Sequence, residues 1–280
     1  MRKLSFLFVV LVVIMFATTG CVDKKPQTVG LLDSIAPADT AAEDTTEEII
    51  SETPMPKAAD ELFDDFFFNF AANKKLQYKR IHFPLPVYKN GKVVKEIQQA
   101  HWKTEHFFMR QDFYTLIFDN KSQMNLVKDT TIDHVVVEKI FFKIKTVKQY
   151  LFNRINGQWQ MTSINYKPIY SNLNASFLKF YDSFATDTAF QMKHLANSIK
   201  FSGPDPDDDN NTMTANLAPE QWPAFAPPMP SGMIYNILYG QKYAESNQKI
   251  FLIRGIANGQ EQVFSFVRKN GKWMLKKLSI

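Results

Sequence analysis

The stretch FNRINGQW at residues 152–159 returns 114 residues later as FVRKNGKW at residues 266–273. Phenylalanine, arginine, Asn-Gly and tryptophan keep their spacing between the two stretches. Asn-Gly between two apolar segments favours a two-residue type I′ turn, so each stretch predicts a β-hairpin. The chain therefore contains one hairpin pattern twice, and we expect Trp159 and Trp273 to lie in the core.

A second match at the same separation lies upstream of each hairpin. Phenylalanines at 63, 66, 67 and 70 align with aromatic residues at 177, 180, 181 and 184. This spacing places the rings on one face of an amphipathic helix, which must pack on an apolar surface. Segments rich in β-branched and aromatic residues supply that surface and predict strands at 135–146, 147–155 and 158–166, and at 233–239, 249–257, 260–269 and 272–280. We expect Leu126, Met161 and Leu275 in the core.

These patterns predict an α+β fold with two tandem cone-shaped domains, at residues 60–170 and 171–280. Each domain would have an N-terminal helical segment packed on a curved antiparallel sheet. A repeat of this length is an ordinary domain size and far too long for a solenoid.

A helix followed by a long hairpin-linked sheet resembles the nuclear transport factor 2-like (cystatin-like) superfamily. The sequence also resembles a family of exported lipoproteins of Gram-negative anaerobes that is described only as a domain of unknown function. The resemblance is carried by the Asn-Gly-x-Trp hairpin and by the segment 66–85, with Gln77, Arg80-Ile81 and Phe83-Pro84-Leu85. The resemblance covers most of residues 60–280. It implies fold and location but no activity.

The N-terminus predicts export. Basic Arg2 and Lys3 precede an apolar run, and the segment ends at Cys21, the only cysteine of the chain. The ending Thr19-Gly20-Cys21 resembles the lipobox of bacterial lipoproteins, which implies a signal peptide at 1–20 and a lipid on Cys21. An ordinary secretory leader, or an uncleaved helix that stays in the membrane, are the alternatives. Lipidation implies attachment to the cell envelope, and the absence of Asp directly after Cys21 favours the outer membrane.

Residues 21–59 differ in composition from the rest of the chain. They are rich in Thr, Ala, Pro and acidic residues and show no apolar period, so we expect a disordered acidic tether. Ser34, Thr40 and Thr45 each follow an aspartate, a pattern that resembles an O-glycosylation acceptor of Gram-negative anaerobes. Such triplets also arise by chance in a linker of this composition.

The charge balance of the remaining chain is basic, with 28 Lys and Arg against 19 Asp and Glu after residue 60. The basic residues are scattered singly or in pairs rather than in an arginine-rich run, and we expect no nucleic-acid partner. A solvated surface is the favoured explanation, with attraction to anionic lipid or polysaccharide as the alternative.

Two segments have some features of metal sites, but we expect no metal at either. His101 and His106 lie five residues apart, which would point them to different faces of a helix that carries a buried Trp102. Asp205, Asp207 and Asp209 match the first alternating positions of a calcium loop. The glycine and the final glutamate of that loop are missing, so a solvated acidic loop is favoured.

No spacing of histidines, nucleophiles or carboxylates identifies a catalytic residue, and no cofactor motif is present. Trp102, Trp222 and Phe225 are the candidate contacts for a ligand or partner, because the proline-rich segment 222–230 could hold exposed rings. Ordinary packing is the alternative.

The sequence therefore favours a non-catalytic envelope lipoprotein that binds a small molecule, a glycan or an envelope protein. One alternative is an enzyme of the ketosteroid-isomerase-like cone type with one active and one degenerate domain. The other is a structural or assembly factor. A cavity with several buried ionisable side chains would favour the enzyme, and a dry apolar pocket would favour binding.

Overall fold

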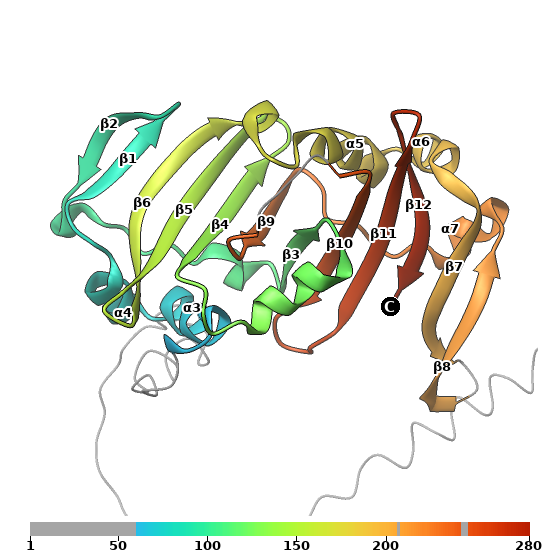
Figure 1. The fold of residues 1–280 in the computed structure, drawn as a ribbon, viewed down its shortest axis with the longest axis horizontal. Helices are drawn as coiled ribbons and strands as arrows, with labels where there is room; N and C mark the ends of the chain where they lie inside the picture. Colours follow the sequence, from blue (N-terminus) through green and yellow to red (C-terminus); the bar gives the residue numbers. More distant parts are fainter. Residues whose placement is uncertain (1–59, 206–207, 242–245) are drawn as a thin grey trace, which may run out of the picture. The chain divides into compact units, whose positions relative to one another are not determined.

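The computed structural model describes residues 60–205, 208–241 and 246–280. One order of elements occurs twice in this part of the chain (Figure 1). The first run comprises α3 (Phe63–Ala72), α4 (Lys74–Arg80), β1 (Leu85–Lys89), β2 (Lys92–Ile97), β3 (Phe113–Phe118), β4 (His134–Phe141), β5 (Thr146–Ile155) and β6 (Gln158–Pro168). The second comprises α5 (Ala175–Thr186), α6 (Thr188–Lys193), β7 (Leu195–Asp205), β8 (Asp208–Leu217), β9 (Met233–Leu238), β10 (Gln248–Gly255), β11 (Glu261–Lys269) and β12 (Lys272–Ser279).

Short helices complete the connections between these elements. They are the 3₁₀ helices η2 (Gln99–His101), η3 (Phe107–Arg110), η4 (Lys121–Lys128), η5 (Ile169–Ser171) and η6 (Pro219–Gln221), and the single-turn helix α7 (Trp222–Phe225). None of the helices in the described ranges is long and apolar enough to cross a membrane.

All twelve strands form one sheet, in the order β2-β1-β6-β5-β4-β9-β3-β10-β11-β12-β7-β8 (Figure 1). Strand β3 of the first run pairs with β10 of the second, and β9 of the second pairs with β4 of the first. The two predicted domains therefore share a sheet, and each run of elements contributes one strand to the other. The expected antiparallel pairing holds for the hairpins, whereas β1 with β6, β7 with β12 and β3 with β9 are parallel.

The two hydrophobic cores lie on opposite faces of the central strands. In β3, Leu116 belongs to the core under α3 and the next residue, Ile117, belongs to the core under α5. In β10, Leu252 and Ile253 divide in the same way. Because successive side chains of a strand point to opposite faces, α3 and α5 cover opposite sides of the shared sheet.

The aromatic stripe of each leading helix packs on the hairpin tryptophan of its own run. The Phe63 ring lies 5.1 Å from Trp159, and the Phe177 ring lies 5.6 Å from Trp273. Both contacts are edge-to-face, a favoured geometry for aromatic pairs. The predicted core positions Trp159, Trp273, Met161 and Leu275 are confirmed as buried, whereas Leu126 is half-buried on η4 and packs at the border of the first core.

The Asn-Gly pattern predicts type I′ turns at residues 156–157, 258–259 and 270–271, and these turns form at the first and the third pair. Asn156 and Gly157 have φ of 51° and 76°, and Asn270 and Gly271 have 49° and 77°. These left-handed values suit Asn followed by Gly and match the twist of the strands. Between β10 and β11, only Gly259 has positive φ and the connection is longer. A further Asn-Gly turn, at residues 90 and 91, joins β1 to β2 and was not predicted.

The acidic loop expected after Phe201 is mostly strand. β7 continues to Asp205, β8 starts at Asp208, and the two strands pair over most of their length. The signal peptide predicted at 1–20 and the tether predicted at 21–59 lie outside the described residues, as do Cys21, Ser34, Thr40 and Thr45.

Candidate functional site

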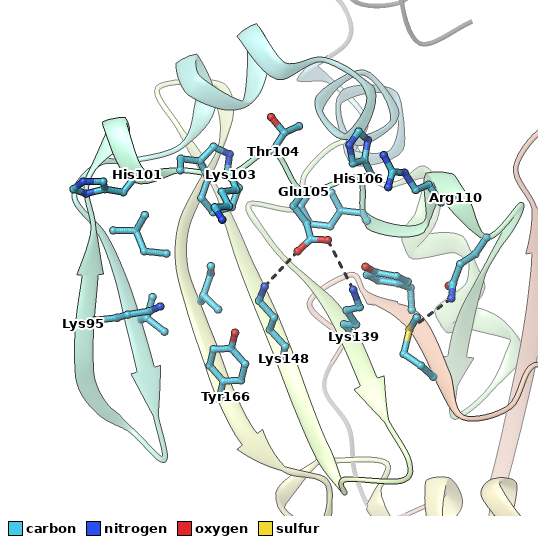
Figure 2. Close-up of a pocket in the computed structure, with 18 of the residues that line it drawn as sticks. Lys95, His101, Lys103, Thr104, Glu105, His106, Arg110, Lys139, Lys148 and Tyr166 are labelled. Carbon is cyan, nitrogen blue, oxygen red and sulfur yellow. Dashed lines mark hydrogen bonds and ion pairs between the residues drawn. The ribbon is translucent and has the colours of Figure 1, made fainter. Parts of the chain in front are cut away.

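A pocket of about 840 Å³ lies on the face of the sheet covered by α3, in the first run of elements (Figure 2). Its floor is formed by side chains of β4, β5, β6 and β9, and one wall is the irregular segment 101–111. Strand β2 contributes Lys95, Glu96 and Ile97 to the lining. The lining includes the charged side chains of Lys95, Lys103, Glu105, Arg110, Lys139 and Lys148.

Glu105 occupies the centre of this pocket. Figure 2 shows its carboxylate pointing from the wall toward the floor, between Lys148 and Lys139. Lys148 Nζ lies 3.3 Å from Glu105 Oε2, and Lys139 Nζ lies 3.8 Å from Oε1. The Tyr150 hydroxyl donates a 2.5 Å hydrogen bond to Oε2. The carboxylate thus forms an ion-pair network with two neighbouring strands.

Gln77, a fully buried residue of α4, fixes the backbone of Glu105. Its Nε2 donates to the Glu105 carbonyl at 2.8 Å, and its Oε1 accepts from the Glu105 amide at 3.1 Å. The same Oε1 accepts from Trp102 Nε1 at 3.1 Å. Because one buried amide holds two points of the wall, Glu105 is preorganised over the floor.

The surroundings of Glu105 keep it ionised. Burial alone would raise its pKa, but the hydrogen bond from Tyr150 and the charges of Lys148 and Lys139 outweigh burial and hold the pKa below its ordinary value. Burial raises the pKa of Tyr150 and of Tyr235, and the negative charge of Glu105 raises both further. At neutral pH the site therefore presents a carboxylate beside neutral phenols.

The corresponding positions of the second run carry no charge, and all but Gln262, the counterpart of Lys148, are apolar. Counting 114 residues on, Lys139 corresponds to Ile253 and Tyr150 to Phe264, and both of these residues are buried in the second core. Gln191, the counterpart of Gln77, accepts from Trp222 Nε1 at 3.1 Å, so Trp222 takes the place of Trp102. Three residues beyond Trp222, where Glu105 would fall, Phe225 packs 5.1 Å from Phe201. The second run thus lacks the charges of the network and has Ile253, Phe264 and Phe225 in the place of Lys139, Tyr150 and Glu105.

The predicted contact residues have different positions. Trp102 is 7% exposed and lines the pocket, and its contact with a ligand stays a prediction. Trp222 is 0% exposed, so its ring is not presented to a partner, contrary to the expectation for segment 222–230. Phe225 is half-buried against Phe201. Trp222 agrees with the alternative for this segment, ordinary packing, because Gln191 and the second core enclose its ring.

Within the described ranges, no group of three or more His, Cys, Asp or Glu side chains could hold a metal ion. Asp205 ends β7, Asp207 lies outside the described residues, and the side chain of Asp209 is likewise not described. The helix expected around Trp102 is wrong: η2 ends at His101 and the chain continues extended, which brings His101 and His106 to the pocket wall.

Sequence reasoning missed Glu105, Lys139 and Lys148. A signal for the lysines was present, because charged residues interrupt the core-facing positions of two strands. Lys139 follows Val137 at i+2, and Lys148 precedes Tyr150 at the same spacing. Since residues two apart in a strand share a face, each lysine lies on a face that is otherwise buried. For Glu105, whose segment is irregular, no such period exists.

The comparisons with known proteins agree with this architecture. The crystal structure of an NTF2-like protein from Bacteroides fragilis NCTC 9343 superimposes with a TM-score of 0.73 at 41% sequence identity, covering 81% of this chain and 98% of that chain. The described region therefore has an α+β fold of the nuclear transport factor 2-like type. Residues 42–280 match the family described as Domain of unknown function (DUF4348), and the chain belongs to that family. No curated protein sequence matches it.

Proposed function

We propose that this protein is a cell-envelope lipoprotein whose pocket around Glu105 binds a ligand without transforming it. The observation that carries the proposal is the network of Glu105 with Lys139, Lys148 and Tyr150 on the floor of an open pocket of about 840 Å³. A large concave site with a few fixed polar groups is typical of small-molecule binding.

The protonation states favour binding over catalysis. A general base works best when its pKa lies near the working pH. Glu105 has the opposite shift, since Tyr150 and the two lysines lower its pKa. Tyr150 and Tyr235 have raised pKa values and stay neutral, and Tyr150 donates a hydrogen bond to Glu105. The site therefore keeps the carboxylate of Glu105 ionised and fixed in position, which suits the binding of a ligand.

A second candidate function is an enzyme with one active and one degenerate cone. The observation in its favour is the half-buried carboxylate of Glu105 beside the phenols of Tyr150 and Tyr235, because ionisable groups inside a cavity are a feature of catalytic cones. In this alternative, a substrate would displace Lys139 and Lys148 and thereby raise the pKa of Glu105. Substrate turnover that is lost in Glu105→Gln would support it.

The remaining parts of the proposal concern architecture and location. We infer that the sheet consists of two tandem cone domains, residues 60–170 and 171–280, that exchange β3 and β9. The support is the repeated element order and the two-core arrangement. Three further parts of the proposal rest on the sequence patterns alone. They are a lipid on Cys21, a tether at 21–59 with sugars on Ser34, Thr40 or Thr45, and a location at the outer membrane. Intact-protein mass spectrometry of the mature form tests the lipid and the sugars.

Native mass spectrometry tests the binding function. The wild-type protein and Thr104→Trp, both full-length, are purified in detergent from the envelope of the source cell. Thr104 is half-buried in the pocket wall, so a tryptophan there fills the pocket without removing a charge. The proposal predicts a non-covalent mass on the wild type that is missing from Thr104→Trp. Equal spectra for the two proteins would contradict it.

A further inference from the structure

Positive charge dominates the Glu105 pocket. Five Lys and Arg side chains line it, against two glutamates. Two of the cations, Lys139 and Lys148, are paired with Glu105. The other three, Lys95, Lys103 and Arg110, are exposed at the rim and have no ion-pair partner among the described residues. Cations gathered around a concave site attract an anionic ligand.

Glu105 adds a different requirement. Tyr150 and Lys148 both donate to Oε2, while Lys139 lies farther away, 3.8 Å from Oε1. The side chain is 23% exposed, and a carboxylate has about four acceptor positions. Glu105 can therefore accept further hydrogen bonds from a ligand, and a ligand made only of anionic groups would be repelled by it. Hydroxyl groups of a ligand are suitable hydrogen-bond donors to such a fixed carboxylate.

Aromatic and apolar side chains form the rest of the lining. Tyr166 and Ile97 are half-buried there, whereas Trp102 and Tyr235 border the pocket with 7% and 1% of their surface exposed. Figure 2 shows Tyr166 next to Lys148 on the floor. Flat rings between polar groups suit a ligand that carries apolar C–H faces as well as hydroxyl groups.

We propose, on the basis of the binding function above, that the ligand is an acidic saccharide. Its sugar hydroxyls would donate to Glu105, its ring would lie against Tyr166, and its anionic groups would lie at the rim, which carries Lys103 on one side of Glu105 and Arg110 on the other (Figure 2). The anionic group can be a uronate carboxylate or a sulfate ester, because both present oxygens to Lys and Arg. A neutral sugar would lack the rim contacts, and a simple dicarboxylate would lack the hydroxyls.

Calorimetry on the full-length protein tests this ligand class with four probes at matched ionic strength. These are cellobiouronic acid, cellobiose 6-sulfate, neutral cellobiose and glutarate. We expect at least one acidic disaccharide to bind more tightly than cellobiose and glutarate, and the stronger of the two acidic probes identifies the anionic group. The double variant Lys103→Gln/Arg110→Gln should weaken this binding about tenfold, since two charge contacts are removed.

Two further variants keep the test specific. Lys269→Gln/Lys272→Gln removes the same charge at exposed positions of the β11–β12 hairpin and should leave the affinity unchanged. Glu105→Gln should weaken the acidic disaccharide but not glutarate. Cellobiose binding as tightly as both acidic probes, or equal weakening in the two double variants, would overturn the proposal. If no probe binds while the envelope-purified wild type keeps a mass that Thr104→Trp lacks, the ligand class is wrong and the binding function stands.

Discussion

Gln77 accepts a hydrogen bond from the indole nitrogen of Trp102 at 3.1 Å, in the middle of the first run of elements. Gln191 and Trp222 make the same bond at the same distance in the second run. Each glutamine also donates back to the carbonyl of the leading helix, Gln77 to Phe70 and Gln191 to Phe184. The same glutamine–tryptophan hydrogen bond thus occurs in both runs. In the first run the glutamine also holds a charged residue, Glu105.

Replacement of these glutamines by leucine should destabilise the protein unequally. Gln77→Leu leaves the buried Trp102 and Glu105 N–H groups without an acceptor and should cost about 3 kcal/mol of unfolding free energy. Gln191→Leu leaves Trp222 Nε1 and the Phe184 carbonyl unpaired, at about 2 kcal/mol. Urea unfolding measures both, with Gln158→Leu at an exposed position as the control. Equal, small effects would show that the glutamines do not hold the wall.

The pH dependence of stability reports on Glu105. Because its folded pKa lies below the ordinary 4.5, its contribution to stability is present above pH 4.5 and is lost as the pH falls through the lower folded pKa. The difference in unfolding free energy between wild type and Glu105→Gln should therefore be constant above about pH 5.5 and shrink below pH 4.5. A difference that grows on acidification would mean that the folded pKa is raised.

The buried ion pair of Lys249 and Asp119 links the exchanged strand β3 to β10. Lys249 is 4% exposed and Asp119 is 7% exposed, and the ammonium group also donates to Asn174 Oδ1 at 2.7 Å. Lys249→Met leaves a buried carboxylate without its cation and should cost about 3–5 kcal/mol. Lys249→Met/Asp119→Leu should recover more than half of that loss in the same urea assay. A double variant as unstable as the single one would contradict this account.

The exchange of β3 and β9 predicts that the first run does not fold by itself. A fragment of residues 60–170 lacks β9, whose Tyr235 and Ile237 belong to the core under α3. It also leaves both edges of β3 unpaired. We expect the fragment to give a poorly dispersed NMR spectrum and to become ordered when mixed with residues 171–280. A well-dispersed spectrum of the fragment alone would show that the exchanged strand is dispensable.

The repeat and the hairpins could be predicted from the sequence because they depend on local spacing. The aromatic stripe at Phe63 and the Asn-Gly pair at 156 and 157 each specify a conformation within a few residues. The exchange of strands is not local. Phe113–Phe118 and Met233–Leu238 are apolar runs that suit any central strand, and their sequences do not determine which strand each one pairs with. The pocket depends on this exchange, because Tyr235 reaches Glu105 only when β9 lies beside β4.

The central claim is that the Glu105 pocket holds its ligand unchanged, and re-binding of the native ligand tests it most directly. The molecule retained by the envelope-purified protein is released by denaturation and incubated with fresh wild type, Glu105→Gln and Thr104→Trp. Mass spectrometry then measures the bound and recovered masses. The account predicts that the wild type re-binds the molecule, that Thr104→Trp does not, and that the recovered mass is unaltered in every sample. A product mass that forms with the wild type but not with Glu105→Gln would contradict the claim and identify an enzyme.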